Sequence, residues 1–579
     1  MATDHNNKRQ SFWLGVRRLF SAKMSSTLSR LRSIMMTAFV SAVLCTTAHA
    51  QTRDPSVKAR PSGVDVAQPS TQTPTQSEMD NADTDPNQWL TSNKGYLGYR
   101  FSELAEINIQ NVSTLKTVCS FKLGEQGSFQ SAPLVYNGVL YMTSVFGTFA
   151  IDASSCKKRW SYQYQPGPHM GQRNNKGAAI SNGRVIRGTP DGHLLALDAA
   201  TGALLWDRTI MDASAGEYAT AAPLVWKDMI FIGKAGGELG IRGEMMAFGG
   251  ADGTKIWGFH TIPGRGETGS ETWKNLDSIN HGGGATWTSY SLDPASGLLL
   301  LPVGNAGPDF DNDSRPGTNL FTNSIVALDA MTGRLRWWHQ LVGPDDHDWD
   351  TTIVAAFNTA DGSHLAAGAG KDGVLHVVDR ASGKLLFTTS IVSQYTNRET
   401  PISTAANVRF CPVAATQWNG PAYSPDTNLL YMNGIDWCAK AIKGPTPTYV
   451  KGKPYLGWAT PTGYGNRDPV EQAFGLVNAI DPTNGRLLWR YRVPSPPVAG
   501  LVVTAGGFLL TADTQGDLFA LDAKTGALLL RRQIGAGAMD GGLITYEVNG
   551  RQFIAVGAGD NNPTYKVKGD NAIVILGLP

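Results

Sequence analysis

The 579-residue chain has few cysteines and few charged residues. Only five cysteines are present, and no two of them have the C-x-x-C spacing of a covalent haem site or a cysteine zinc site. Charged residues make up 17% of the sequence, with 50 basic and 48 acidic side chains. Seven of the basic residues lie among the first fifty, which contain one acid, so the rest of the chain is mildly acidic. This charge balance argues against nucleic acid as a partner.

The first fifty residues contain an apolar run that is too short to span a bilayer. The run extends over Ile34–Cys45, whereas a transmembrane helix needs about 20 apolar residues. Basic residues precede it, and Ala48-His49-Ala50 follows it with the small-residue pattern of a signal-peptide cleavage site. We predict a signal peptide over residues 1–50, cleaved after Ala50, and a mature protein outside the cytoplasm without a membrane span. A buried N-terminal helix is the alternative.

Four cysteines remain after the predicted signal peptide. An oxidising compartment favours disulfide bridges, and four cysteines allow three pairings. We expect the pairing of nearest neighbours, Cys119 with Cys156 and Cys411 with Cys438.

Residues 51–86 are rich in Ser, Thr, Pro and Gln and show no apolar period. This composition predicts a disordered linker. No later segment resembles it, so we predict a single domain over residues 87–579.

An internal repeat indicates the fold of that domain. An apolar strand, a D-x-x-T/N-G turn and a second strand, often ending in Trp, recur along the chain with the alternation of a β-hairpin. The Asp or its equivalent occurs at positions 152, 198, 252, 329, 379, 481 and 522. The step from 379 to 481 is about twice the usual one, which predicts a degenerate copy between them, with residues 424–431 as part of it.

Seven visible copies and one hidden copy make eight. Repeats of about 40–50 residues built from short strands are typical of β-propellers, because one small sheet cannot bury both of its faces without neighbours. We therefore predict an all-β protein with the fold of an eight-bladed β-propeller. A linear β-solenoid is the alternative.

Three segments depart from the repeat and concentrate unusual residues. Residues 235–243 are glycine-rich and contain Glu238, residues 281–308 contain Trp287 and Asn305, and residues 345–350 hold four acids and one His. Taken singly, each segment fits a surface turn, a core Trp or a solvated acidic loop. Taken together, glycines allow close approach of a flat ligand, and the carboxylates offer Ca²⁺ ligands and a general base.

Together these segments resemble the pyrroloquinoline quinone (PQQ)-dependent alcohol dehydrogenases, the quinoprotein methanol and ethanol dehydrogenase family. The resemblance covers essentially the whole mature chain, from Trp89 and the segment 98–102 to the segment 541–554. It implies an eight-bladed propeller with PQQ-type repeats, with PQQ and Ca²⁺ in a central funnel, and a periplasmic location.

The resemblance also implies roles for individual residues. Glu238, Asn305 and Asp350 match the family's Ca²⁺ ligands. Asp350 also matches the base that takes the alcohol proton, and Lys371 the cation near the reactive quinone oxygens. The residues implied to bind PQQ are Gln130, Lys176, Thr220, Gly236, Gly237, Trp287, Lys371 and Asn419.

The chain departs from the family pattern at several positions. The adjacent cysteine pair that forms a disulfide ring over PQQ is absent, and Met170-Gly171 stand near that face. Gln130 replaces a Glu, and Val498 stands at or near a usual Trp. These changes predict a roomier pocket and a bulky, secondary or polymeric alcohol. Thr352 stands where lanthanide-using relatives carry an extra Asp, which favours Ca²⁺.

We therefore predict a periplasmic PQQ- and Ca²⁺-dependent oxidoreductase that converts an alcohol to an aldehyde or ketone. Because the chain has no haem site, its electrons are expected to pass to a separate cytochrome c or similar acceptor. The alternative is a non-catalytic PQQ-like propeller scaffold of the cell envelope. A hydrolase is disfavoured by the lack of a convincing Ser/His/Asp set. The sequence leaves the oligomeric state and the alcohol open.

Overall fold

The computed structural model describes residues 67–396, 401–402, 408–441, 443–457, 466–535 and 537–579. The predicted signal peptide, its cleavage site and residues 51–66 of the predicted linker lie outside these residues.

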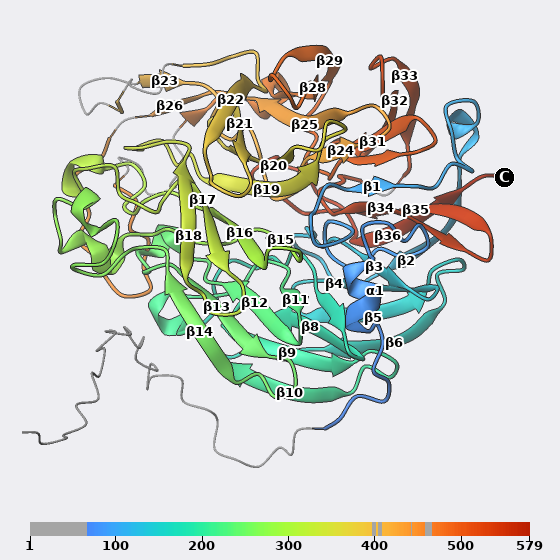
Figure 1. The fold of residues 1–579 in the computed structure, drawn as a ribbon, viewed down its shortest axis with the longest axis horizontal. Helices are drawn as coiled ribbons and strands as arrows, with labels where there is room; N and C mark the ends of the chain where they lie inside the picture. The colour runs from blue at the N-terminus through green and yellow to red at the C-terminus, as the bar shows by residue number, and fades with distance from the viewer. Residues whose placement is uncertain (1–66, 397–400, 403–407, 442, 458–465, 536) are drawn as a thin grey trace, which may run out of the picture. The chain divides into compact units, whose positions relative to one another are not determined.

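The described residues form eight antiparallel sheets that are the blades of a β-propeller (Figure 1). Blades one to four are β3 (Leu134–Tyr136), β4 (Val139–Thr143), β5 (Gly147–Asp152) and β6 (Lys158–Gln163); β7 (Ala179–Ser181), β8 (Arg184–Gly188), β9 (His193–Asp198) and β10 (Leu204–Thr209); β11 (Leu224–Trp226), β12 (Met229–Gly233), β13 (Glu244–Gly249) and β14 (Lys255–His260); and β15 (Ser291–Asp293), β16 (Leu298–Val303), β17 (Ser324–Asp329) and β18 (Leu335–Gln340).

The second half of the propeller continues the pattern with two variations. Blades five to eight are β19 (Thr351–Asn358), β20 (His364–Gly370), β21 (Val374–Asp379) and β22 (Leu385–Ser390); β24 (Ala422–Ser424), β25 (Leu429–Asp436), β28 (Phe474–Ile480) and β29 (Leu487–Val493); β30 (Val502–Thr504), β31 (Phe508–Ala512), β32 (Asp517–Asp522) and β33 (Leu528–Gln533), with β1 (Phe101–Ser102) parallel to β30; and β34 (Leu543–Val548), β35 (Arg551–Ala558), β36 (Ala572–Gly577) and β2 (Lys116–Lys122).

The predicted all-β, eight-bladed fold is confirmed, but the predicted position of the hidden copy is wrong. Residues 424–431 lie in β24 and β25, which share a sheet with the turn at Asp481. The eighth blade has no Asp–Gly turn, because β2 from the start of the chain supplies its fourth strand. The long step to Asp481 arises from insertions around β25, which carry the extra sheet of β23 (Val408–Phe410), β26 (Ala439–Ala441) and β27 (Asn466–Arg467).

The recurring Trp and Gly residues join neighbouring blades. Trp160 on β6 donates its indole N–H to the carbonyl of Ala199 in the next blade at 3.0 Å. Gly202 of that turn has φ +76°, and a Cβ there would lie 2.6 Å from the Trp160 ring. A residue without a side chain is therefore required at this contact. The same indole-to-carbonyl bond occurs at Trp206–Gly250, Trp257–Ala330, Trp337–Arg380 and Trp489–Ala523.

A disulfide occupies the equivalent contact where the last blade meets the first. Both predicted pairs are present, Cys119–Cys156 and Cys411–Cys438. Cys119 lies on the outer strand β2 directly after a register shift, as Trp206 does on β10. Cys156 ends the turn of the first blade at φ +57°, in the place that Gly202 takes in the second blade. The bridge thus closes the ring at the junction between the chain's two ends.

This equivalence predicts the outcome of exchanging the bridge for a Trp–Gly contact. Cys119→Ala with Cys156→Ala should lower the free energy of unfolding by up to about 4 kcal/mol, the chain-entropy value for a closed loop of this length. Cys119→Trp with Cys156→Gly should recover part of that loss, because Gly adopts the positive φ that position 156 requires. Denaturant unfolding without reductant measures both variants. Equal stability of the two double variants would contradict the equivalence.

Residues 67–86 are ordered against the propeller, which corrects part of the predicted disordered linker. Helix α1 (Gln76–Asp80) begins with a capping box between Thr75 and Glu78. Met79 is buried, and Glu78 accepts a hydrogen bond from the Tyr136 hydroxyl at 2.8 Å. Burial of apolar side chains offsets the entropy of ordering this segment despite its polar composition.

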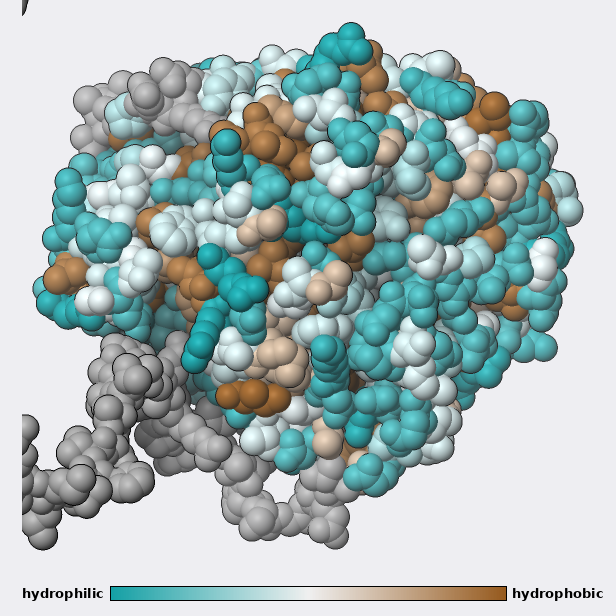
Figure 2. Space-filling model, viewed as in Figure 1, coloured by the Kyte–Doolittle hydropathy of each residue, from teal (hydrophilic) through white to brown (hydrophobic). Residues whose placement is uncertain are grey.

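The first and fourth strands of the blades differ in burial. The first strands, such as β3, β7 and β11, are buried throughout, whereas the fourth strands alternate between exposed and buried positions. Hydrophilic side chains accordingly cover most of the face in Figure 2, with hydrophobic ones in small groups among them. Within the described part of the chain, no helix has the length and apolar character needed to cross a membrane.

Candidate functional site

The predicted site residues come from two kinds of connection. Gln130, Lys176, Thr220, Trp287 and Asp350 each lie one to four residues before the first strand of a blade. Glu238, Asn305 and Lys371 each follow a second strand, namely β12, β16 and β20. In an antiparallel pair, the start of one strand and the end of its neighbour lie at the same edge. Both kinds of connection therefore meet at one end of the propeller.

A cavity of about 500 Å³ lies at this end. Seven of the predicted residues line it, namely Gln130, Thr220, Gly236, Glu238, Trp287, Asp350 and Lys371. Lys176 and Asn305 contact residues of its wall, as described below. Gly237 follows Gly236 in the chain. A Cβ at position 237 would lie 3.6 Å from Ala285, an ordinary contact distance.

Lys371 holds two carboxylates at the edge of the cavity. Its ammonium lies 2.7 Å from Asp350 Oδ2 and 2.7 Å from Asp348 Oδ1. Asp350 directly precedes β19 and Lys371 directly follows β20, and the pairing of Thr351 with Gly370 brings the two together. Burial raises the pKa of Asp348 to about 8, although the nearby Lys371 ammonium opposes this.

The three predicted metal ligands approach one another around Asp350. The backbone N–H of Asn305 donates to Asp350 Oδ1 at 2.7 Å. Burial raises the pKa of Glu238, and the negative charge of Asp350 adds to this increase. No group of three His, Cys, Asp or Glu side chains among the described residues is close enough to hold a metal. Glu238, Asp350 and Asn305 carry the kind of oxygen atoms that Ca²⁺ prefers, and both carboxylate oxygens of Asp350 already have partners, the Asn305 N–H and the Lys371 ammonium.

Lys176 is a buried cation over two indole rings. Its ammonium lies 4.8 Å from the ring centre of Trp287 and 5.5 Å from that of Trp418. It is 2% exposed and has no hydrogen-bond partner among the residues that the structure describes. Burial lowers the pKa of Lys176 to about 7, with a smaller opposing effect from Glu238. An unpaired buried ammonium is costly, which suits a position that receives an anionic group from a ligand.

Two acidic residues at the site were not among the predicted ones. Asp348 was recognised only as part of the acidic segment 345–350. Asp309 is fully buried, and neither of its carboxylate oxygens has a partner within the described parts of the chain. Burial raises the pKa of Asp309 well above its usual value, and Asp348, Glu238 and Asp350 raise it further. No local pattern around Asp309 distinguishes it from a turn residue.

Asn419 and Val498 lie elsewhere than predicted. The Asn419 side chain donates to the carbonyl of Val498 at 2.7 Å. Both residues line a second, smaller cavity, and neither is among the lining residues of the main one. Gln417 and Trp418 line the main cavity instead, two and one positions earlier.

The cavity wall near the missing cysteine pair also differs in detail from the prediction. Gln172, Arg173 and Asn174 line it in this region, whereas Met170 and Gly171 do not. Gly171 packs against the Tyr218 ring, where a Cβ would come within 2.0 Å. The wall is therefore formed here by polar side chains rather than by a disulfide ring.

Comparisons with known proteins identify the family of the chain. The family described as "Glucose/ethanol/alcohol dehydrogenase, beta-propeller domain" matches residues 89–393, slightly more than half of the chain. The family "Outer membrane protein assembly factor BamB" matches residues 473–570.

Similar proteins include the quinoprotein alcohol dehydrogenase PedH of Pseudomonas putida, 30% identical, with 82% of this chain and 86% of the relative covered. The lanthanide-dependent methanol dehydrogenase of Methylacidiphilum fumariolicum is 28% identical, with 83% and 86% covered. Among solved structures, the quinohemoprotein alcohol dehydrogenase ADHIIG of Pseudomonas putida superposes with a TM-score of 0.77 at 26% identity, covering 89% of this chain and 83% of that one. The chain therefore belongs to the family of PQQ-dependent, quinoprotein alcohol dehydrogenases.

Proposed function

We propose that this protein is a periplasmic alcohol dehydrogenase that uses PQQ and Ca²⁺ and passes electrons to a separate acceptor. The observation that carries the proposal is the grouping of Asp350, Lys371 and Asn305 at one edge of a cavity that Glu238 and Trp287 also line. A non-catalytic scaffold does not need a buried general base, a cation and oxygen atoms suited to binding a metal ion at one place.

The residues of the cavity fit PQQ by their chemistry. Trp287 offers a large flat face to a planar quinone. Lys176 offers a ligand carboxylate a buried ammonium that has no hydrogen-bond partner among the described residues. The buried side-chain oxygen of Gln130 likewise has no partner among them. Glu238, Asn305 and Asp350 offer the hard oxygen ligands that Ca²⁺ prefers. The unpaired groups of Lys176 and Gln130 are costly to leave buried and would gain partners when the cofactor binds.

The chain's own residues supply the acid–base part of the reaction. Bound PQQ would supply the hydride acceptor of the reaction and Ca²⁺ its Lewis acid, held by Glu238, Asn305 and Asp350. Asp350 accepts the hydroxyl proton through its carboxylate. Lys371, 2.7 Å from that carboxylate, stabilises the negative charge that develops nearby. Asp348 also contacts this ammonium, at 2.7 Å.

The proposed substrate is a bulky, secondary or polymeric alcohol. The cavity wall formed by Gln172, Arg173 and Asn174 lacks the disulfide ring that adjacent cysteines form in the family. Val498 lines the second, smaller cavity and not the main one. These features support a pocket wider than one for methanol. Electrons then pass to an external cytochrome c or similar carrier, since the sequence contains no C-x-x-C haem site.

Calcium is proposed rather than a lanthanide ion. Thr352, two residues after Asp350, is buried and shares a hydrogen bond with the hydroxyl of Thr416 at 2.6 Å. It therefore adds no carboxylate to the metal site. The scaffold alternative has support from the match over residues 473–570, a range that contains none of the predicted catalytic, metal-binding or cofactor-binding residues, although residues 561–565 line the main cavity.

Turnover of the reconstituted protein tests the proposal. The mature protein, free of cofactors, would be assayed with an artificial dye acceptor and short, long, secondary and polymeric alcohols. The expected result is turnover only when both PQQ and Ca²⁺ are added, with lower activity when La³⁺ replaces Ca²⁺. Turnover without PQQ, or none with both additions, would contradict the proposal. Methanol as the preferred substrate would contradict the substrate class alone.

A further inference from the structure

Two loops from neighbouring blades carry the central residues of the proposed metal site. Asn305 begins the connection from β16 to β17, and Asp350 ends the connection from β18 to β19. Their direct link is the hydrogen bond from the Asn305 backbone to Asp350 Oδ1 at 2.7 Å. The relative placement of the two loops therefore decides whether both residues reach one metal ion.

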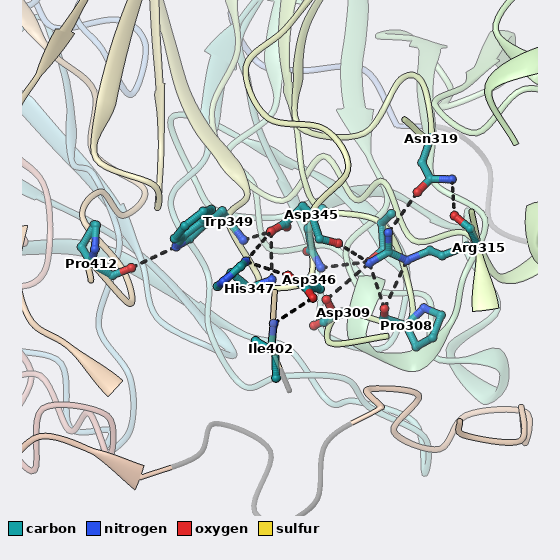
Figure 3. A network of polar contacts seen from close by, with 12 residues as sticks. Pro308, Asp309, Arg315, Asn319, Asp345, Asp346, His347, Trp349, Ile402 and Pro412 are labelled. Carbon is teal, nitrogen blue, oxygen red and sulfur yellow. Dashed lines mark hydrogen bonds and ion pairs between the residues drawn. The ribbon is translucent and has the colours of Figure 1, made fainter. Parts of the chain in front are cut away.

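Arg315, which itself lies in the connection from β16 to β17, links this loop to the loop that ends in Asp350 (Figure 3). Its guanidinium donates to the carbonyl of Pro308 from Nε at 3.2 Å and from Nη2 at 3.1 Å. Nη2 also donates to the carbonyl of Asp345 at 2.6 Å. The remaining arm, Nη1, donates to Asn319 Oδ1 at 3.0 Å. One fully buried cation thus holds the residue three positions after Asn305 and the residue five positions before Asp350.

The segment between Asp345 and Asp350 passes this restraint to the base. The Asp345 carboxylate accepts the backbone N–H groups of His347 at 2.9 Å and Trp349 at 3.0 Å. The Trp349 indole stacks on the His347 ring at 4.1 Å and donates to the carbonyl of Pro412 at 2.9 Å. Figure 3 shows these groups forming one continuous network with Arg315. The loop that ends in Asp350 has little freedom to move while Asp345 stays fixed.

We infer that Arg315 is a positioning residue of the metal site: it fixes the Asn305 loop against the Asp350 loop and thereby sets the affinity for Ca²⁺. The inference rests on the proposed function. A planar guanidinium reaches carbonyls of two loops at once, whereas a lysine ammonium offers a single point of attachment on a flexible stem. Residues behind the ligands of a metal typically change its affinity about 10- to 100-fold when they are replaced.

Arg187 provides a matched control for a purely structural role. It is also fully buried, and it also joins backbone carbonyls of neighbouring blades, at Gly147 with 2.7 Å, Val145 with 2.6 Å and Gly188 with 3.1 Å. It does not contact the loops of Asn305 or Asp350 in any described interaction. Arg187→Lys should therefore lower stability as Arg315→Lys does, without altering the metal site.

Titration of Ca²⁺ into the PQQ-loaded, calcium-free protein tests the inference. We expect Arg315→Lys to raise the Kd for Ca²⁺ about 10-fold or more, and Arg187→Lys to leave it unchanged while both lower the melting temperature. Excess Ca²⁺ should restore most of the turnover of Arg315→Lys. If Arg315→Lys does not fold, Asn319→Gly removes one arm of the network and keeps the left-handed backbone of Asn319, at φ +57°. A smaller rise in Kd than for Arg315→Lys is then expected, below the roughly 10-fold lower end of such effects, because the bonds to Pro308 and Asp345 remain.

The outcomes separate the two proposals. Calcium binding by the wild type with unchanged affinity in the Arg315 and Asn319 variants would overturn the inference and leave the proposed function intact. Equal weakening in Arg187→Lys would also overturn it, because the effect would then follow from stability alone. Absence of calcium binding in the wild type would overturn the proposed function and the inference together.

Discussion

Asp350→Asn is expected to lower kcat by about 10³-fold, within the range that a positioned general base contributes. The amide keeps the volume of the carboxylate and can still accept the hydrogen bond from the Asn305 backbone. It cannot accept the hydroxyl proton, and it gives a bound metal a neutral ligand in place of a charged one. Steady-state kinetics with saturating PQQ and Ca²⁺ measures the loss, and a titration with PQQ checks that cofactor binding changes by only a few-fold.

Asp348→Asn is the matched control for this prediction. Asp348 contacts the same ammonium of Lys371 at the same distance of 2.7 Å as Asp350 does. Because it is not assigned as the base or as a metal ligand, its replacement should lower kcat by only about 10-fold, through the altered environment of Lys371. If the two variants lose activity equally, the assignment of the base to Asp350 is wrong.

Lys176→Met is expected to weaken PQQ binding about 100-fold, within the cost of removing one partner of a buried charge pair. At the same time it should raise the melting temperature of the cofactor-free protein, because Lys176 is a buried cation without a described partner. The two effects have opposite signs, which distinguishes a ligand-binding cation from a structural one. Fluorescence quenching on PQQ addition and thermal unfolding of the cofactor-free protein measure them.

Lys94→Met is the contrasting variant. Lys94 is also buried, but its ammonium donates to three backbone carbonyls, those of Ala82, Asp83 and Asp85. Its replacement should lower the melting temperature and leave PQQ affinity unchanged. A lower melting temperature in Lys176→Met as well, with unchanged PQQ affinity, would show that the ammonium of Lys176 has a structural role.

The lowered pKa of Lys176 gives PQQ binding a defined pH dependence. In the cofactor-free protein, burial lowers this pKa to about 7, so the side chain is charged below pH 7 and neutral above it. A bound carboxylate favours the charged form, and above pH 7 binding must therefore take up a proton. Affinity for PQQ should be constant below about pH 7 and fall by up to about 10-fold per pH unit above it. Lys176→Arg should remove this dependence, because arginine stays charged.

The same shift has a consequence for stability. Above pH 7 the folded, cofactor-free protein releases the proton of Lys176, while the unfolded chain holds it up to about pH 10.4. The unfolded state then binds more protons, so this residue makes the protein more stable as pH rises through that window. Below pH 7 its destabilising effect is fully present. Lys176→Met should lack this contribution to the pH profile.

The sequence was sufficient to predict the propeller because its repeat reflects local contacts. Most of these turns pack against a Trp of the preceding blade in the same geometry, as Gly202 and Trp160 illustrate. The repeat did not reveal the eighth blade, because its fourth strand, β2, comes from the other end of the chain and the blade therefore has no Asp–Gly turn. Its location was misjudged because inserted segments around β25 lengthen one step of the repeat without adding a blade.

The site was predictable to the extent that strand ends determine it. Asp350 and Lys371 lie at the same end of one antiparallel pair, which brings them into an ion pair. Asn419 lies on an equivalent connection, but its side chain turns to the carbonyl of Val498. Asp309 and Arg315 could not be singled out, because their surroundings are assembled from loops of different blades whose approach has no local signal in the sequence.

The most direct test of the account is the absorbance of PQQ bound to the protein when alcohol is added without any electron acceptor. In a protein loaded with PQQ and Ca²⁺, one equivalent of a suitable alcohol should reduce the bound cofactor in a single turnover, and Asp350→Asn should do so about 10³-fold more slowly. A protein that binds PQQ tightly at Trp287 and Lys176 but shows no spectral change with any alcohol of the panel would contradict the central claim that this cavity oxidises alcohols.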